Sequence, residues 1–169
     1  MTDTALTTPA TDNDRLSLQQ GIRTALAAVL AYWITGLLHL PGGYWAAISS
    51  IVVMQSAVGA TVTASRDRLA GTAIGAVVGL LIAMVWHHSL LVFGLGVLLV
   101  MMLCTALHYK GAGRLGGVTV AIIVLIPYPG ALWHIAFQRF LEVSLGIIVS
   151  LLVAVAWTRM EMWVQREKT

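Results

Sequence analysis

Long stretches without ionised side chains constrain this sequence most. Between Arg23 and Arg66, 42 consecutive residues include no Asp, Glu, Lys or Arg, and 41 more separate Arg68 from Lys110. Two further runs, of 24 and 16 such residues, follow later in the chain. A helix needs about 20 predominantly apolar residues to cross a bilayer. The first two runs are therefore each long enough for two membrane-spanning helices, and the last two runs for one each.

Breaks inside these runs define six expected segments. Residues 40–43 interrupt the first run and residues 87–89 interrupt the second. The expected spans are 23–40, 44–63, 69–86, 90–109, 115–130 and 135–158. Continuous apolar runs rich in Leu, Ala and Gly favour helices over the weak alternating segments of a β-barrel. We therefore predict an all-α, polytopic membrane protein with six transmembrane helices.

The composition excludes most soluble classes of protein. Only 10% of the residues are Asp, Glu, Lys or Arg, whereas about 25% are charged in an ordinary soluble domain. The basic residues are scattered, which argues against a nucleic-acid partner. Cys104 has no partner for a disulfide, and His87 and His88 have no further ligand at metal-binding spacing. Because no catalytic motif is present either, we expect no enzyme activity, no cofactor and no metal. We expect the lipid bilayer to surround the chain.

The positions of the basic residues predict the orientation in the membrane. Nine of the ten lie in the terminal segments or in two of the expected loops, and Arg139 alone lies on the opposite side. Lys and Arg accumulate on the cytoplasmic side, so both termini are expected in the cytoplasm. We divide the chain into a flexible polar tail (1–20), a six-helix transmembrane domain (21–160) and a short cytoplasmic extension (161–169).

A glycine stripe lies on the third expected span. Gly71, Gly75 and Gly79 recur every four residues, so they form one smooth face on which another helix can approach closely. The contact would lie within the subunit or between subunits. The alternative is that the stripe lines a narrow pore.

Polar residues follow the second expected span. Ser49, Ser56 and Thr63 recur every seven residues, which places them on one helical face, and Gln55 lies beside them. Hydroxyl groups in membrane helices often bond their own backbone, so a structural explanation is available for each. The functional alternative is that the stripe lines a hydrated path.

Two charges mark the sixth expected span. Arg139 and Glu142 are three residues apart and therefore share a helical face. If the helix begins near Trp133, both lie within the bilayer, where ionisable residues are costly and typically functional. In that interpretation Arg139 binds a carboxylate through its planar guanidinium group and Glu142 carries a proton. The alternative is an interfacial pair in which Arg139 extends outward.

A charged tripeptide separates the second and third expected spans. We expect Arg66, Asp67 and Arg68 to form a tight cytoplasmic turn. Such a turn is either a topological anchor or a means of attracting anions to an inner vestibule. Arg23, at the start of the first span, has the same two interpretations.

One block of the chain carries a family pattern. It opens with Tyr44-Trp45, passes through a Val-rich run that ends in Gln55, and continues with Gly59-Ala60-Thr61 and then Arg68-Leu69-Ala70-Gly71-Thr72. This pattern resembles the fusaric acid resistance (FUSC-like) family, also called aromatic acid exporters. The resemblance covers roughly residues 20–160, and the late Arg139 followed by Gly146 is similar to the final helix of that family.

The resemblance implies a transporter domain in the bacterial inner membrane. Its substrates would be small organic anions such as aromatic carboxylic acids, with proton-driven export as the expected mode. Because many such exporters carry two of these domains, a single copy implies a homo-oligomer, with a dimer as the first expectation. The plant aluminium-activated malate channels resemble distant relatives of this family. A passive anion channel between subunits and a non-transporting membrane subunit are therefore the alternative functions.

The candidate residues fall into two sets. The substrate path is expected to include Gln55, Ser49, Ser56, Arg139 and Glu142. The cytoplasmic set that attracts anions is expected to include Arg23, Arg66 and Arg68.

Overall fold

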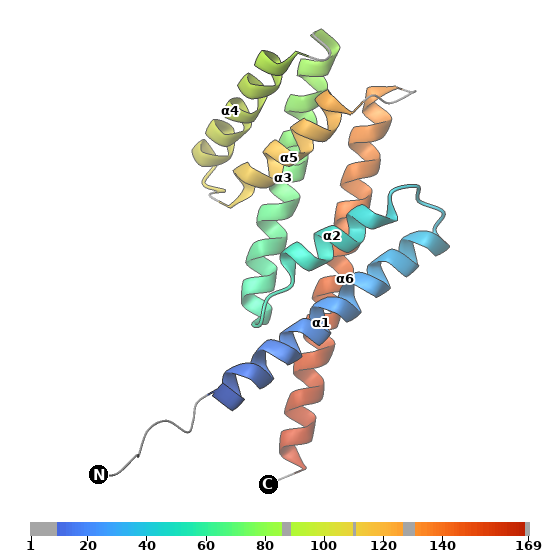
Figure 1. The fold of residues 1–169 in the computed structure, drawn as a ribbon, viewed down its shortest axis with the longest axis vertical. Helices are drawn as coiled ribbons and strands as arrows, with labels where there is room; N and C mark the ends of the chain where they lie inside the picture. Colours follow the sequence, from blue (N-terminus) through green and yellow to red (C-terminus); the bar gives the residue numbers. More distant parts are fainter. Residues whose placement is uncertain (1–9, 86–88, 110, 127–130, 168–169) are drawn as a thin grey trace, which may run out of the picture.

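Six helices make up the part of the chain that the computed structural model describes, which is residues 10–85, 89–109, 111–126 and 131–167 (Figure 1). No strand occurs within these ranges, so the all-α prediction is confirmed. The helices are α1 (Ala10–Leu37), α2 (Gly43–Val53), α3 (Val58–Val85), α4 (Leu90–Ala106), α5 (Ala112–Leu125) and α6 (Leu132–Arg166). The predicted pair His87 and His88 and the end of the fifth predicted span, 127–130, lie outside the described residues.

The predicted turn at Arg66, Asp67 and Arg68 is wrong. The tripeptide lies inside α3, which continues through it without interruption because it has no Gly or Pro to end a helix. The chain instead leaves the helix at 54–57, where Met54 adopts an extended conformation. The hydroxyl of Thr61 accepts a hydrogen bond from the backbone N–H of Gln55, which closes the break.

The predicted flexible tail, residues 1–20, stays a prediction, although its second half is helical. Residues 10–20 form the first turns of α1, and residues 1–9 lie outside the described part of the chain. At the other end, α6 continues as a helix through the predicted extension as far as Arg166.

Two of the helices are long and apolar enough to cross a membrane, namely α3 over 58–84 and α6 over 133–166. The helices α2, α4 and α5 are apolar but shorter, with 11, 17 and 14 residues. Large apolar side chains such as Leu81, Leu91 and Leu152 are exposed on the outside of the molecule. Such a surface suits lipid rather than water. The six-span topology and the cytoplasmic termini stay predictions.

The chain repeats its architecture after three helices. Two residues after the end of the helix that opens each half, α1 or α4, a histidine has a positive φ, 54° at His39 and 63° at His108. The residue after each histidine donates an equivalent backbone hydrogen bond to the helix end. Leu40 donates to the carbonyl of Thr35, and Tyr109 donates to the carbonyl of Cys104. Two residues with the same rare conformation and the same C-terminal cap indicate an internal repeat.

The third helices of the two halves share residues at one constant spacing. Arg68 in α3 corresponds to Arg139 in α6, and Gly75 corresponds to Gly146. The same spacing relates Val78, Leu80, Leu81 and Ala83 to Val149, Leu151, Leu152 and Ala154. These two helices run in opposite directions (Figure 1). Three helices in each half and opposite directions are typical of the inverted repeats of membrane transporters.

The short helix of each half packs on the third helix of the other half, α2 on α6 and α5 on α3. Gly146 lies against the carbonyl of Ala46, and Gly75 lies against the carbonyl of Gly116, so the two contacts are equivalent. Close backbone approach of this kind is possible only where the helix carries no Cβ.

The glycine stripe faces α5 of the same chain. Gly71 lies against Ala112, and Gly79 lies against Ile123, on either side of the contact at Gly75. The stripe is therefore filled by backbone and side chains of α5, which leaves no space for a pore along this face.

We predict that Gly75→Ala and Gly146→Ala each destabilise the fold. An added Cβ would collide with a backbone carbonyl at both positions, and such overpacking typically costs about 1–3 kcal/mol. Gly94→Ala is the matched control, because nothing lies within 4 Å of its added Cβ. The measurement is the unfolding midpoint in detergent, and equal midpoints for all three variants would contradict the close contact.

Candidate functional site

A buried ion pair forms the centre of the candidate site. Arg139 Nη1 lies 3.0 Å from Glu142 Oε2, with the two residues one turn apart on α6. The side chain of Glu142 is fully buried, and that of Arg139 is 12% exposed. The Glu142 carboxylate lies against Gly42, which directly precedes α2 and has no Cβ in its way.

The packing of α2 on α6 places this pair. Below the Gly42–Glu142 contact, Ala46 meets Gly146 one turn further along both helices. The Ser150 hydroxyl then donates to the backbone carbonyl of Ser50, with an oxygen–oxygen distance of 3.2 Å. Contacts at every fourth residue of both helices fix the register, so the start of α2 lies beside the ion pair.

Two aromatic rings cover the guanidinium group of Arg139. Its Cζ lies 4.8 Å from the ring centroid of Trp45 and 5.8 Å from that of Tyr44. Cation–π attraction of this kind is stronger where water is excluded. The site therefore combines a positive charge with apolar ring faces, which is the chemistry that recognises an aromatic carboxylate.

The ion pair leaves much of its hydrogen-bonding capacity unused. Nε and Nη1 of Arg139 and both carboxylate oxygens of Glu142 form no hydrogen bond of good geometry. A buried pair with unsatisfied donors and acceptors is costly for a purely structural element. Arg139 thus retains donors that can bind a second carboxylate.

A second buried arginine contacts α2 one turn after Trp45. Arg68 Nη2 donates to the hydroxyl of Ser49 at 3.3 Å, and both residues are buried. Ser49 lies one turn after Trp45, so α2 contacts both arginines through neighbouring positions of one face. The sequence predicts Arg68 in a cytoplasmic turn. This prediction is wrong, because Arg68 is buried inside the protein.

Arg23 is also buried rather than at the surface. Its Nη1 donates to the carbonyl of Ser56 at 3.1 Å, and its Nη2 donates to the Thr158 hydroxyl at 3.4 Å. Its Cζ lies 5.6 Å from the ring centroid of Trp157. These contacts hold the chain where it leaves α2, so they provide a structural role for Arg23.

The predicted polar stripe of Ser49, Ser56 and Thr63 does not share one face, because α2 ends at Val53. Ser49 is buried, whereas Ser56 lies in the break and Thr63 is exposed on α3. Gln55 is exposed beside Ser56, and its described hydrogen bonds are made by its backbone to Thr61. The structure brings neither Gln55 nor Ser56 onto the ion pair.

Arg66 lies apart from the ion pair, exposed on α3. Its Cζ is 5.0 Å from the ring centroid of Tyr109. It lines an open hollow of about 390 Å³ with Asp67 and His108. Of the three arginines expected to attract anions, Arg66 alone is at the surface.

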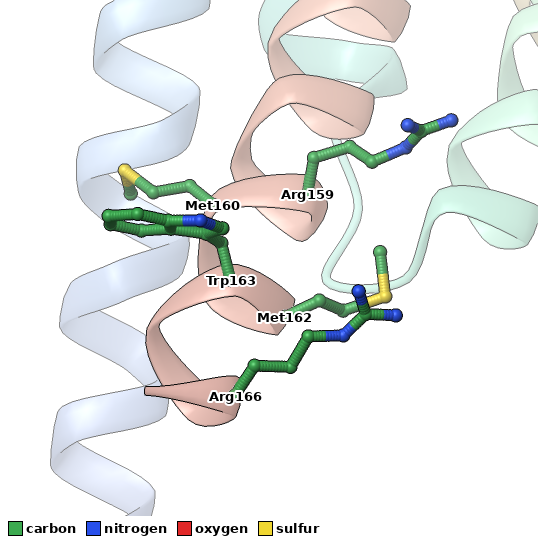
Figure 2. Close-up of a pocket in the computed structure, with 5 residues that line it drawn as sticks. All are labelled: Arg159, Met160, Met162, Trp163 and Arg166. Carbon is green, nitrogen blue, oxygen red and sulfur yellow. The ribbon is translucent and has the colours of Figure 1, made fainter. Parts of the chain in front are cut away.

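Another hollow, of about 720 Å³, lies at the C-terminal end of α6 (Figure 2). The guanidinium groups of Arg159 and Arg166 extend to one side of the helix, and Met160 and Trp163 lie on the other side. This surface is open and lacks buried polar groups. Within the described residues, no group of three His, Cys, Asp or Glu side chains can hold a metal ion.

The residues that the sequence did not point to are Tyr44 and Trp45, which cover Arg139. Ser49 is one of the predicted substrate-path residues, and its contact with Arg68 is the part that the sequence did not predict. The signal available in the sequence was the position of Tyr44 and Trp45 directly after Gly42 and Gly43, in the block that carries the family pattern.

Comparison with known proteins confirms the family resemblance. A family described as fusaric acid resistance protein-like matches residues 26–153, which include Arg68, Arg139 and Glu142. The uncharacterized transporter YdhK of Escherichia coli (strain K12) is 34% identical over 144 residues, which cover 79% of this chain and 21% of YdhK. YdhK of Salmonella typhimurium is 33% identical over 147 residues, with the same two coverages.

A further relative is the inner membrane protein YeeA of Escherichia coli (strain K12), which is 32% identical over 145 residues, or 81% of this chain and 40% of YeeA. The chain therefore spans about a fifth to two fifths of the length of these relatives. No solved structure matches the chain.

We predict that the two charges depend on each other for stability. Glu142→Leu alone leaves a buried, unpaired guanidinium group, and Arg139→Met alone leaves a buried carboxylate, so each is expected to cost about 3–5 kcal/mol. The double variant removes both charges and is expected to be more stable than either single variant. Unfolding in detergent measures all three, and a double variant as unstable as the sum of the singles would disprove the coupling.

Proposed function

The chain belongs to the fusaric acid resistance protein-like family, and we propose that it forms a membrane domain that transports small organic anions across a bacterial inner membrane. Aromatic carboxylates are the first substrate class, and export coupled to protons is the mode. The names of two relatives, a transporter and an inner membrane protein, support the general class of protein. The observation that carries the substrate class is the buried Arg139–Glu142 pair under Tyr44 and Trp45.

The chemistry of this site selects an aromatic anion. The guanidinium group of Arg139 provides charge and paired donors for a carboxylate. The rings of Trp45 and Tyr44 provide apolar faces against which an aromatic ring packs. A buried site of this kind disfavours inorganic cations, because the ligand must take the place of the Glu142 carboxylate as the negative partner of Arg139.

Exchange of partners at Arg139 couples the anion to a proton. With Glu142 ionised, Arg139 is neutralised internally. When Glu142 takes up a proton, the guanidinium group loses its partner and binds the carboxylate of the substrate instead. When the substrate leaves, Glu142 releases the proton and pairs with Arg139 again. The proton and the anion therefore enter and leave the site together, so one proton accompanies each anion, and export follows the outward gradient of the anion.

The position of α2 also supports the proposal. In transporters built from inverted repeats, unusually short helices in corresponding positions of the two halves mark the binding site. Here α2 and α5 are those helices, and α2 provides the aromatic cover. Exposed apolar faces favour a homo-oligomer, for which a dimer is the proposal.

The experiment is benzoate flux in proteoliposomes with an imposed pH gradient. We expect Glu142→Gln to lower the flux by about tenfold or more, because the amide keeps the shape of the side chain but cannot exchange a proton. Glu161→Gln is the matched control, since its carboxylate only accepts a hydrogen bond from the Trp157 indole N–H, which an amide oxygen can also accept.

Two results would contradict the proposal. Full proton-driven flux in Glu142→Gln would exclude this residue as the proton carrier. Flux through the unaltered protein that is independent of the pH gradient would identify an anion channel instead. The amount of folded protein in the vesicles is matched by near-UV circular dichroism before each comparison.

A further inference from the structure

The two halves of the chain differ at the charge that accompanies their shared arginine. Arg68 and Arg139 occupy equivalent positions of α3 and α6. At the same spacing, the residue that corresponds to Glu142 is Gly71. Gly71 lies against the backbone of Ala112, where no carboxylate would fit. The second half therefore supplies its own counter-ion, and the first half does not.

Arg68 consequently has no neutralising partner among the residues that the structure describes. It is 5% exposed, and no carboxylate of the described residues lies within ion-pair distance of it. The hydroxyl of Ser49, 3.3 Å from Nη2, is a neutral and distant partner, and Nε has none. An unpaired charge inside a membrane protein is costly and marks a functional position.

The other buried arginine of the first half, Arg23, has more hydrogen-bond partners than Arg68. Arg23 donates to a backbone carbonyl and a hydroxyl and lies over the Trp157 ring, so its surroundings explain it. Arg68 has one long hydrogen bond in their place.

Arg68 also lies at a sparse contact between two helices. The short helix α2 packs mainly against α1 and α6, and its contact with α3 is sparse. The Ser49–Arg68 hydrogen bond crosses this seam between α2 and α3. In repeat-based transporters one bundle rocks against the other, so a sparse seam is where a site opens.

From these observations we propose that Arg68, together with Ser49, binds the carboxylate of the transported anion at the seam between α2 and α3. The ligand takes the place that Glu142 fills beside Arg139 in the other half. This inference rests on the proposed function for the class of ligand. It adds a second binding position, one helical turn along α2 from the first.

The test supplies the missing carboxylate from the protein itself. Ser49→Asp places a carboxylate beside Arg68, and Ser49→Asn is the matched neutral control. We expect benzoate, but not the neutral benzamide, to raise the thermal unfolding midpoint of the full-length protein and of Ser49→Asn. In Ser49→Asp the unfolding midpoint without benzoate is expected to be higher than in Ser49→Asn, and the apparent affinity for benzoate lower by about tenfold or more.

The outcomes separate this inference from the proposed function. An equal benzoate shift in Ser49→Asp and Ser49→Asn, or no shift in the unaltered protein, would overturn the Arg68 site. Either result leaves the flux comparison of Glu142→Gln with Glu161→Gln to decide on transport. Conversely, a benzoate shift that Ser49→Asp abolishes supports the Arg68 site even if the vesicles show no flux.

Discussion

The contact of a backbone carbonyl with a glycine, made twice, holds this fold together. Gly146 allows α2 to lie against α6, and Gly75 allows α5 to lie against α3. Inside a bilayer, apolar area gives little preference for one helix partner over lipid, so close van der Waals contact decides which helices associate. These two contacts lock the halves into one another. They also set the register of α2, which brings Trp45 to Arg139 and Ser49 to Arg68.

The apolar runs predicted the number of helices in the described part of the chain, because long apolar segments leave a strong signal in the sequence. They did not predict every boundary, since α2 ends at Val53 and α3 begins at Val58, inside the second predicted span. The break between α2 and α3 was not predictable in the same way. Residues 54–57 include no Gly or Pro, whereas Arg66 and Arg68 looked like residues of a turn in water. In the folded chain Arg66 lies over the Tyr109 ring and Arg68 donates a hydrogen bond to Ser49. Both arginines therefore have partners within a continuous helix.

The candidate site was predictable only in part for a similar reason. Arg139 and Glu142 are close in sequence, so helical periodicity was enough to pair them. Their aromatic cover comes from a helix almost a hundred residues earlier, and no local pattern relates Trp45 to Arg139. The seven-residue spacing of Ser49, Ser56 and Thr63 misled because periodicity has meaning only within one continuous helix, and α2 ends at Val53.

The balance of buried charge limits what can pass through such an interior. Arg23 and Arg68 are buried and Arg139 nearly so, whereas Glu142 is the only buried acidic side chain among the residues that the structure describes. An interior with excess positive charge repels cations and attracts anions at any point where it opens. Arg139 is already neutralised, and Arg23 bonds to the break after α2 and to α6, which leaves Arg68 as the buried arginine with the fewest partners. The sign of the ligand thus follows from an imbalance between two halves that are otherwise built alike, and the choice of anion follows from the rings on α2.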